Sequence, residues 1–563
     1  MAKTKIAVFD LTGCDGCQFH LMSLNELLLD LFQDFEINYW RLLTEPSKID
    51  CDIAIIEGAV TTEEHIKLLK EIRQTSKVVI AIGACALNGN VFAQIPQKQR
   101  AKLAAKIYDA NYQLKAKFLE PVAKFIQVDE QVSGCPPNIE DFKKILAKYQ
   151  KEPVVSALKT VTVPDYVAKI EGHGILKINF KTQQASFQVE ESERLIEGLL
   201  IGKKFQQAPF INARICGICP VAHNLCSWAA IENAYQVQPL LAVINLRKLL
   251  LAAQTIKSHV LHLFFLVLPD YAQVKGGIEL ATKYPAEFHL MLNIKRTADR
   301  TMEIVGGSSA FPTTTILGGF AQMPDLIELK KISQSIEEIL DEAEDLVKLF
   351  ASLKIPSLTT QTRLLTTNPV SGQYPLYPGS LNTTIKESVQ SKSTAKLGIL
   401  ADGTVIKVGA LARLSSYADN LHSQAKELWQ QHPVDPHNPF DNNLAQAIEV
   451  LHFLEEIQLL VEDLTKTDLN QTIGLKTPPS LKQAVSGQAA LEAPRGVLIH
   501  QVTLEPDGTI QNYNIIPPTQ INLASLNHEA QILAQQSQTQ TNLKKSAEQL
   551  IRAFDPCITC AVH

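Results

Sequence analysis

Residues 77–83 read KVVIAIG, a continuous apolar run bounded by a lysine and a glycine. A Val/Ile run of this length is typical of a strand that is buried on both faces of a sheet. Lys5–Leu11 and Asp52–Glu57 have the same character, and Lys124–Val128 is expected to be a further strand. Because helical patterns separate these runs, residues 1–150 are predicted to form an α/β domain with a doubly wound parallel sheet.

Cysteines follow the predicted strands of this domain. Cys14 and Cys17 come after the first strand, Cys85 follows residues 77–83, and Cys135 lies beyond the last strand. The carboxyl ends of strands in an open α/β sheet meet at one edge, where such sheets gather their ligands. Four thiolates that converge there, with glycines beside them, suit a 4Fe–4S cluster. A four-cysteine zinc site is the alternative, because ligand softness and geometry do not exclude it.

The composition of the 563-residue chain limits its class. With 53 Lys and Arg against 58 Asp and Glu, the net charge is −5, so a basic nucleic-acid-binding surface is not expected. No apolar run reaches the roughly 18 residues that a membrane helix needs, and the N-terminus lacks a signal-peptide pattern. We therefore expect a cytoplasmic protein without a membrane span. The ten cysteines then indicate metal or redox chemistry rather than disulfides.

The rest of the chain has a different organisation. Residues 151–166 contain two prolines and no helical period, which predicts a linker. Residues 167–563 are predicted to form a large, mainly α domain with small β elements, beginning with an antiparallel hairpin around 181–185. A Gln-rich surface helix is expected at 531–547. The strongest helical patterns lie at 221–235, 244–266, 326–353 and 442–465, and the further β elements near 398–410 and 496–515.

This second part contains two Cys-x-x-Cys pairs that are far apart in the sequence. Cys216 and Cys219 precede a helical pattern, whereas Cys557 and Cys560 lie at the C-terminus. If the pairs meet, they supply four soft thiolates for zinc, nickel or iron. A structural zinc ribbon draws its pairs from nearby sequence, so the separation argues against one. The residues alone thus predict a buried four-thiolate metal site.

Several motifs resemble those of NiFe hydrogenases. Residues 214–223 (RICGICPVAH) and 555–563 (DPCITCAVH) resemble the two signature motifs of the large subunit. Residues 11–18 (LTGCDGCQ), 83–85 (GAC) and 134–137 (GCPP) are similar to the small subunit around its proximal 4Fe–4S cluster. The resemblance implies both subunits in one chain, a flavodoxin-like N-terminal domain, and the soluble, cofactor-linked branch of the family.

The resemblance also implies metal ligands. Cys216 and Cys557 would bind nickel terminally, and Cys219 and Cys560 would bridge nickel to an iron that carries cyanide and carbon monoxide. Together these form a Ni–Fe(CN)2CO centre. A buried Mg²⁺ is implied as well, and its expected ligands are Glu197, His563 and the carbonyl of Ile515.

Further residues receive roles from the same resemblance. Arg495 would lie over the open face of the centre and donate to a cyanide, and Pro518 and Thr519 would cradle the other cyanide. His223 would donate to a bridging thiolate. Glu171, within a KIEGH motif, would accept the proton after either Cys557 or Arg495 has taken it from H2. These five residues, Arg495, Pro518, Thr519, His223 and Glu171, complete the predicted site.

Two departures from the family pattern affect the route of electrons. Only Cys51 and Cys226 remain outside the motifs, and both are interpreted as buried hydrophobic residues, so one cluster is expected. Electrons must then pass from it to an acceptor protein, of ferredoxin or flavoprotein (diaphorase) type. Ser308 and Phe311 replace a basic residue and a histidine that are usual in the family, which changes the expected polarity near the cluster.

The sequence leaves two other functions open. One is a complex-I-like electron-transfer module, a related class that lacks the four metal cysteines. The other is a zinc-stabilised scaffold without catalytic activity. A homo-oligomer is compatible with the sequence.

Overall fold

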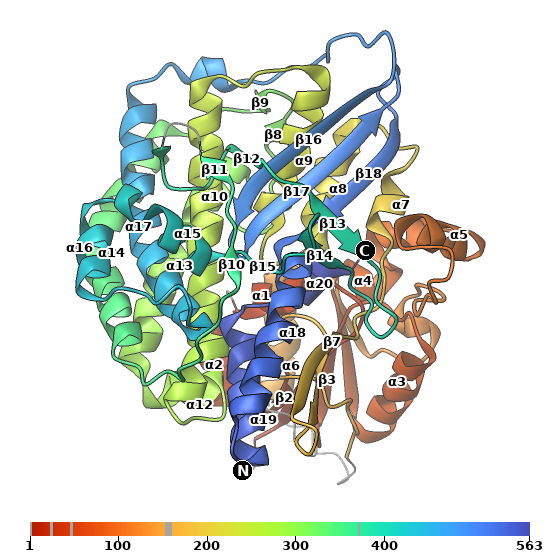
Figure 1. The fold of residues 1–563 in the computed structure, drawn as a ribbon. Coiled ribbons are helices and arrows are strands. Elements are labelled where there is room, and N and C mark those ends of the chain that lie inside the picture. The colour runs from red at the N-terminus through yellow and green to blue at the C-terminus, as the bar shows by residue number, and fades with distance from the viewer. Residues whose placement is uncertain (1–2, 23–25, 45–48, 152–159, 370–371, 563) are drawn as a thin grey trace.

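The computed structural model describes residues 3–22, 26–44, 49–151, 160–369 and 372–562 (Figure 1). The predicted linker therefore lies partly outside the described residues. The helices and strands are β1 (Lys5–Asp10), α1 (Gly16–Met22), α2 (Glu26–Asp34), β2 (Glu36–Trp40), β3 (Ile53–Glu57), α3 (Glu63–Thr75), β4 (Val78–Ile82), α4 (Gly83–Asn88), α5 (Gln97–Ile107), β5 (Glu130–Val132), α6 (Ile139–Lys151), β6 (Gly174–Asn179), β7 (Gln184–Val189), α7 (Ile196–Leu200), α8 (Ala208–Asn212), α9 (Pro220–Tyr235), α10 (Leu241–Leu261), α11 (Leu268–Tyr271), α12 (Gly277–Lys283), α13 (Pro285–Gly306), β8 (Thr315–Ile316), β9 (Gly319–Phe320), α14 (Leu326–Ala351), β10 (Arg363–Leu364), β11 (Asn368–Pro369), β12 (Gly379–Ser380), β13 (Ile385–Ser388), β14 (Leu397–Leu400), β15 (Ile406–Lys407), α15 (Ala410–Tyr417), α16 (Ser423–Gln431), α17 (Asn442–Thr465), β16 (Val485–Ala493), β17 (Gly496–Leu504), β18 (Ile510–Ile516), α18 (Pro518–Gln536), α19 (Gln540–Ala553) and α20 (Ile558–Ala561).

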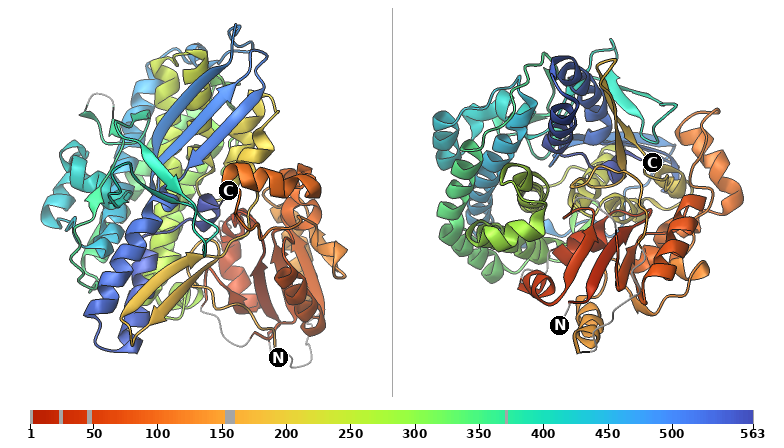
Figure 2. Two further views of the ribbon diagram at one scale, coloured as in Figure 1. Left: turned by 45° about the vertical axis from the view of Figure 1, so that its right-hand side comes forward. Right: turned by 90° about the horizontal axis from the view of Figure 1, so that it is seen from below.

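The N-terminal part contains a five-stranded parallel sheet with the strand order β2-β1-β3-β4-β5. Alternate residues of β1, β3 and β4 enter two different apolar clusters: Val8 lies in the cluster that contains Phe142 of α6, and Phe9 in the cluster that contains Leu69 of α3. Helices thus cover both faces, as the continuous apolar runs predict. The carboxyl ends of the strands face the remainder of the molecule (Figure 2).

The prediction of a strand at Lys124–Val128 is wrong. A short 3-10 turn, Val122–Lys124, ends where this strand is expected to begin, and the strand is β5, further along the chain. The apolar side chains that suggested a strand pack under the sheet instead: Ile126 is buried in the same cluster as Leu69. The sequence analysis also missed β2, an edge strand whose apolar run is interrupted by Asn38, which donates to Asp50.

The second part is built around long helices. α10, α13, α14 and α17 pack side by side and form the helical layer on the left of Figure 1. Leu241–Tyr271, which includes α10, is long and apolar enough to cross a membrane, but its most apolar window is entirely buried within the protein. That burial is typical of a core helix. The Gln-rich stretch 531–547 is not one helix, because α18 ends at Gln536 and α19 begins at Gln540.

A second sheet lies beside α9. Its order is β11-β12-β16-β17-β18, and its pairings are antiparallel. The predicted hairpin near residue 180 is present as β6 and β7. The last helical turn, α20, lies between the N-terminal domain and the helical layer (Figure 2). The largest apolar cluster includes Val8 of the first sheet and Leu249 of α10, so the two parts share one core.

Candidate metal centre

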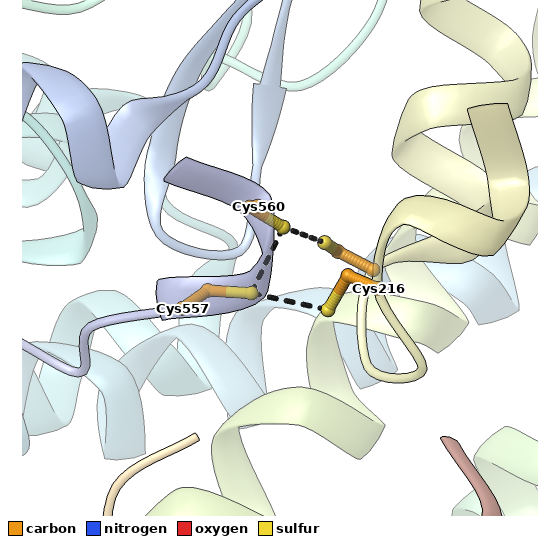
Figure 3. A group of neighbouring side chains, drawn as sticks. Cys216, Cys557 and Cys560 are labelled. Carbon is orange, nitrogen blue, oxygen red and sulfur yellow. Dashed lines mark hydrogen bonds between the residues drawn. The ribbon is translucent and has the colours of Figure 1, made fainter. Parts of the chain in front are cut away.

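Four cysteines meet at the junction of the two parts (Figure 3). Cys216 and Cys219 precede α9, and Cys557 and Cys560 belong to the turn at α20. The Sγ–Sγ distances are 3.1 Å for Cys216–Cys557, 3.2 Å for Cys219–Cys560 and 2.9 Å for Cys557–Cys560. All four sulfurs lie within 4.8 Å of one another and are buried. The structure therefore brings together the two pairs that the sequence analysis singled out.

The thiol chemistry of this group favours a bound cation. These distances are well above the about 2.05 Å of a disulfide bond, and the cysteines are free. Burial raises the pKa of the Cys557 and Cys560 thiols well above the ordinary value. Thiolates in such a place need a positive charge, which a soft metal ion supplies. The donor set thus fits a nickel–iron pair, and also zinc.

Local backbone features fix the C-terminal pair. The N–H of Cys557 donates to Oγ1 of Thr519, 2.9 Å away, at the start of α18. The N–H of Ile558 donates to the carbonyl of Glu171. Gly172 comes so close that a Cβ there would lie 2.6 Å from the Ile558 side chain, with φ at +75°. The KIEGH loop and the C-terminal motif therefore pack directly against each other.

Glu171 is completely buried beside this pair. Its carboxylate accepts the N–H of Thr559 at 3.1 Å and is hydrogen-bonded to the Thr559 hydroxyl. Burial, reinforced by the Cys216 sulfur, raises the pKa of Glu171 to about 8. A carboxyl group with such a pKa can gain and lose a proton near neutral pH.

Arg495 lies in the turn between β16 and β17 and is held by one acidic residue. Nε donates to the Asp555 carbonyl at 2.6 Å, and Nη2 donates to the Asp555 carboxylate at 2.8 Å. Despite burial, Asp555 and the neighbouring cysteines hold the pKa of Arg495 well above its usual value. Nη1 is buried without a hydrogen-bond partner among the described residues. A buried cationic donor is thus left over beside the four sulfurs.

His223 connects the site to a polar chain that sequence analysis missed. Its Nε2 lies 3.5 Å from the Cys560 sulfur, and its Nδ1 lies 3.2 Å from Nε2 of His500. His500 in turn contacts the Tyr513 hydroxyl at 2.8 Å, which donates to Ser227. No motif in the sequence points to His500. It lies on β17, where its direct partner on β18 is Ile515, and Tyr513 stands two positions before that partner.

The other predicted residues are Pro518 and the three expected Mg²⁺ ligands. Pro518 begins α18 immediately before Thr519. Glu197 and Ile515 are buried on α7 and β18, respectively. His563, the third predicted Mg²⁺ ligand, lies outside the described residues.

The four cysteines of the N-terminal domain lie at the carboxyl edge of the first sheet. Cys85 and Cys135 lie close together, because the Asn90 side chain contacts the sulfurs of both. A Cβ on Gly83, which has φ of +79°, would lie 2.4 Å from the Cys17 sulfur. Cys14 is buried, whereas the other three are partly exposed.

Phe311, one of the two residues that depart from the family pattern, lies beside this group. Phe311 is buried in a small apolar cluster with Cys14 and Ala213, and the Arg214 guanidinium lies 5.2 Å from the centre of its ring. Ser308 is partly exposed. The environment of Cys14 is therefore apolar on the side where Phe311 stands, with one cation behind the ring.

Cys51 and Cys226 take no part in either group. The Cys51 sulfur lies 3.1 Å from the Ser76 hydroxyl, and Cys226 contacts backbone carbonyls of the second sheet. Both are buried. Their contacts fit the structural role that we expect for them.

Comparisons with known proteins agree with this arrangement. Residues 194–289 and 402–563 match the family model for nickel-dependent hydrogenase, and residues 14–149 match that for the 20 kDa subunit of NADH ubiquinone oxidoreductase. Sulfhydrogenase 1 subunit alpha of Pyrococcus furiosus is 32% identical over 421 residues, which cover 71% of this chain and 97% of that protein. NAD-reducing hydrogenase HoxS subunit beta of Cupriavidus necator is 25% identical over 472 residues, covering 71% and 94%.

Solved structures show the same fold. The NAD⁺-reducing NiFe hydrogenase in the H2-reduced state has a TM-score of 0.63 at 24% identity, and the match covers 71% of this chain and 98% of that one. The Ni–Fe–Se hydrogenase of D. vulgaris Hildenborough gives 0.58 at 20% identity, covering 70% and 98%.

The chain belongs to the nickel-dependent hydrogenase family. It is therefore a hydrogenase, an oxidoreductase that acts on H2. The match of residues 14–149 to a second family model is consistent with a small and a large subunit fused in one chain. This family membership favours the hydrogenase over the complex-I-like alternative.

Proposed function

We propose that this hydrogenase cleaves H2 reversibly and heterolytically at a Ni–Fe(CN)2CO centre held by its four clustered cysteines. The observation that carries the proposal is the buried set of sulfurs, all within 4.8 Å, from motifs 341 residues apart. Cys216 and Cys557 are assigned as terminal nickel ligands, and Cys219 and Cys560 as bridging ligands. When bound, the metal pair supplies the electrophile that accepts the electrons of H2 while a proton is released.

Three residues are proposed to hold the diatomic ligands. The spare Nη1 of Arg495 is a charged, buried donor of the kind that an anionic cyanide requires. Thr519 and Pro518, at the start of α18, are assigned to the second cyanide. The Thr519 hydroxyl also accepts the N–H of Cys557, so this residue would both orient a metal ligand and line the cyanide pocket.

The proton is proposed to leave through Glu171. Cys557 or Arg495 would take it first, because both are buried at the group of four cysteines. Glu171 is held through Thr559, two residues from Cys557, and its pKa of about 8 suits a relay near neutral pH. His223 is assigned as a donor to the Cys560 sulfur, which would reduce the negative charge on that bridging ligand.

One 4Fe–4S cluster is proposed for Cys14, Cys17, Cys85 and Cys135. Four thiolates around one zinc ion lie roughly 3.8 Å apart, given a Zn–S bond of about 2.3 Å. Among the described residues, only the Cys216 group has all its sulfurs within 4.8 Å. The wider spacing in the N-terminal domain supports a cluster over a zinc ion. Electrons would leave from it to an acceptor protein of ferredoxin or flavoprotein type.

The remaining assignments are also proposals. Glu197, Ile515 and His563 would hold a Mg²⁺ ion, and the protein would act in the cytoplasm. Residues 1–150 would form the small-subunit-like domain, of flavodoxin-like type as its 2-1-3-4-5 strand order supports. Residues 151–166 would be a linker, and 167–563 the catalytic domain.

Infrared spectroscopy of the anaerobically purified protein tests the proposed centre. We expect one carbonyl and two cyanide stretching bands, because these ligands absorb where proteins do not. A zinc-stabilised scaffold would show none of them. Bands that are absent from a preparation with full nickel occupancy would contradict the Ni–Fe(CN)2CO assignment.

A further inference from the structure

Asn90 joins two of the cysteines at the edge of the first sheet. It begins a short 3-10 turn, Asn90–Gln94, directly after α4. Its side-chain Nδ2 lies 3.4 Å from the Cys135 sulfur and 3.7 Å from the Cys85 sulfur. Both distances are within hydrogen-bond range for a sulfur acceptor.

The orientation of the Asn90 amide is fixed by its own oxygen. Oδ1 accepts the N–H of Val91 at 2.8 Å, and the Asn90 N–H donates to Oδ1 of Asn88 at 2.9 Å. Because the oxygen is engaged on the backbone side, the NH2 group must face the sulfurs. The contact is therefore a pair of N–H···S donations.

The backbone conformation at position 90 favours asparagine. Asn90 has φ of +54° and follows Gly89, with φ of +77°, so two successive residues are left-handed. A Cβ on Gly89 would lie 2.7 Å from the Leu119 side chain. Among residues with a side chain, asparagine and aspartate adopt this conformation most readily. Glycine would satisfy the turn equally well but would bring no donor.

We propose that Asn90 raises the reduction potential of the 4Fe–4S cluster by donating N–H···S hydrogen bonds to Cys85 and Cys135. The inference rests on the proposed cluster. One-electron reduction adds negative charge that is shared by the iron and its sulfur ligands. A donor stabilises the reduced form more than the oxidised form, so the cluster accepts an electron at a higher potential.

The Asn90 contact lies on the side of the proposed cluster where the cysteines are partly exposed. Cys85 and Cys135 are half-buried, whereas Cys14 is buried against Phe311. The apolar ring lacks a hydrogen-bond donor and so disfavours the added charge at Cys14. The donor of Asn90 therefore offsets the effect of Phe311 on the reduction potential. It keeps this potential high enough for the cluster to accept electrons from the nickel–iron site.

The test is an EPR-monitored redox titration of Asn90→Gly and Asn90→Asp beside the wild type. Asn90→Gly keeps the left-handed turn and removes the donor, so we expect a lower midpoint potential. Asn90→Asp keeps the shape but places an acceptor and a negative charge beside the thiolates, so a larger decrease is expected. Asn138→Ser, an exposed asparagine three residues after Cys135 that caps α6, is the control and should leave the potential unchanged.

The outcomes separate the two proposals. A midpoint potential of Asn90→Gly equal to that of the wild type, with cluster iron intact, would overturn the role of Asn90 and leave the proposed function standing. A wild-type protein without a 4Fe–4S signal would overturn both. If the variants lose iron, pulsed EPR of wild-type protein labelled with ¹⁵N-asparagine decides: a ¹⁵N coupling supports the contact, and its absence refutes it.

Discussion

The backbone N–H of Gly217 donates a hydrogen bond of 2.8 Å to the carbonyl oxygen of Cys14. Gly217 stands between two cysteines of the candidate nickel–iron site, and Cys14 is one of the four cysteines of the first sheet. A Cβ on Gly217 would lie only 2.1 Å from the Cα of Gly16. The two Cys-x-x-Cys motifs are thus in direct backbone contact, which would give electrons a short route between the two proposed centres.

Gly217→Ala should disturb this contact. The added methyl group meets backbone rather than a flexible side chain, so the two motifs must move apart, at a cost of about 1–3 kcal/mol. We expect a lower thermal unfolding midpoint and slower H2-dependent reduction of a viologen dye. Gly13→Ala is the matched control, because its Cβ would find its nearest neighbour at 3.6 Å. Identical behaviour of the two variants would show that close packing of the motifs is unimportant.

Glu171→Gln should block the proton route while the metals stay bound. The glutamine keeps the shape and the contact to Thr559 but cannot carry a proton, so steady H2 oxidation should fall by about 100-fold or more. In the wild type, acceptance of a proton requires the ionised form, so oxidation should rise with pH through the region near the pKa of about 8. That pH-dependent limb should vanish in the variant. Turnover near the wild-type rate would assign Glu171 a structural role.

Arg495→Lys should preserve charge but lose the planar arrangement that Asp555 fixes. Lysine carries its three N–H donors on a single nitrogen, so it cannot reproduce the two contacts to Asp555 and the separate Nη1 donor that the planar guanidinium provides. Loss of one preorganised donor lowers turnover by about 100-fold in other enzymes, and we expect a similar decrease with nickel content unchanged. Arg300→Lys, at an exposed ion pair on α13, serves as control. Equal activities of both variants would remove Arg495 from the catalytic site.

The sequence predicts the positions of those cysteines that follow a clear strand or belong to a motif. The buried runs of β1, β3 and β4 place Cys14, Cys17 and Cys85 at one edge of the sheet, because parallel strands end together. No equally direct signal places Cys135, since β5 is short and the apolar residues before it pack as a loop. The predicted strand at 124–128 fails for that reason.

Contacts between distant residues could not be predicted in the same way. Asp15 accepts the N–H of Gly172 at 2.8 Å across 157 positions, and this contact depends on how the two parts of the chain share one core. The Asn90 contact depends on two successive left-handed residues, which a hydrophobic pattern does not reveal. His500 reaches His223 only because two strands bring its side chain under α9.

Metal analysis of the wild type and of Cys557→Ala tests the central claim most directly. The account predicts about one nickel and five iron atoms per wild-type chain, four of the iron atoms in the cluster and one at the active site. Cys557→Ala should lose the nickel and all H2 activity but keep the four cluster irons, because the N-terminal cysteines are untouched. Zinc in place of nickel in the wild type, iron near nine or thirteen atoms per chain, or full nickel and activity in Cys557→Ala would contradict it.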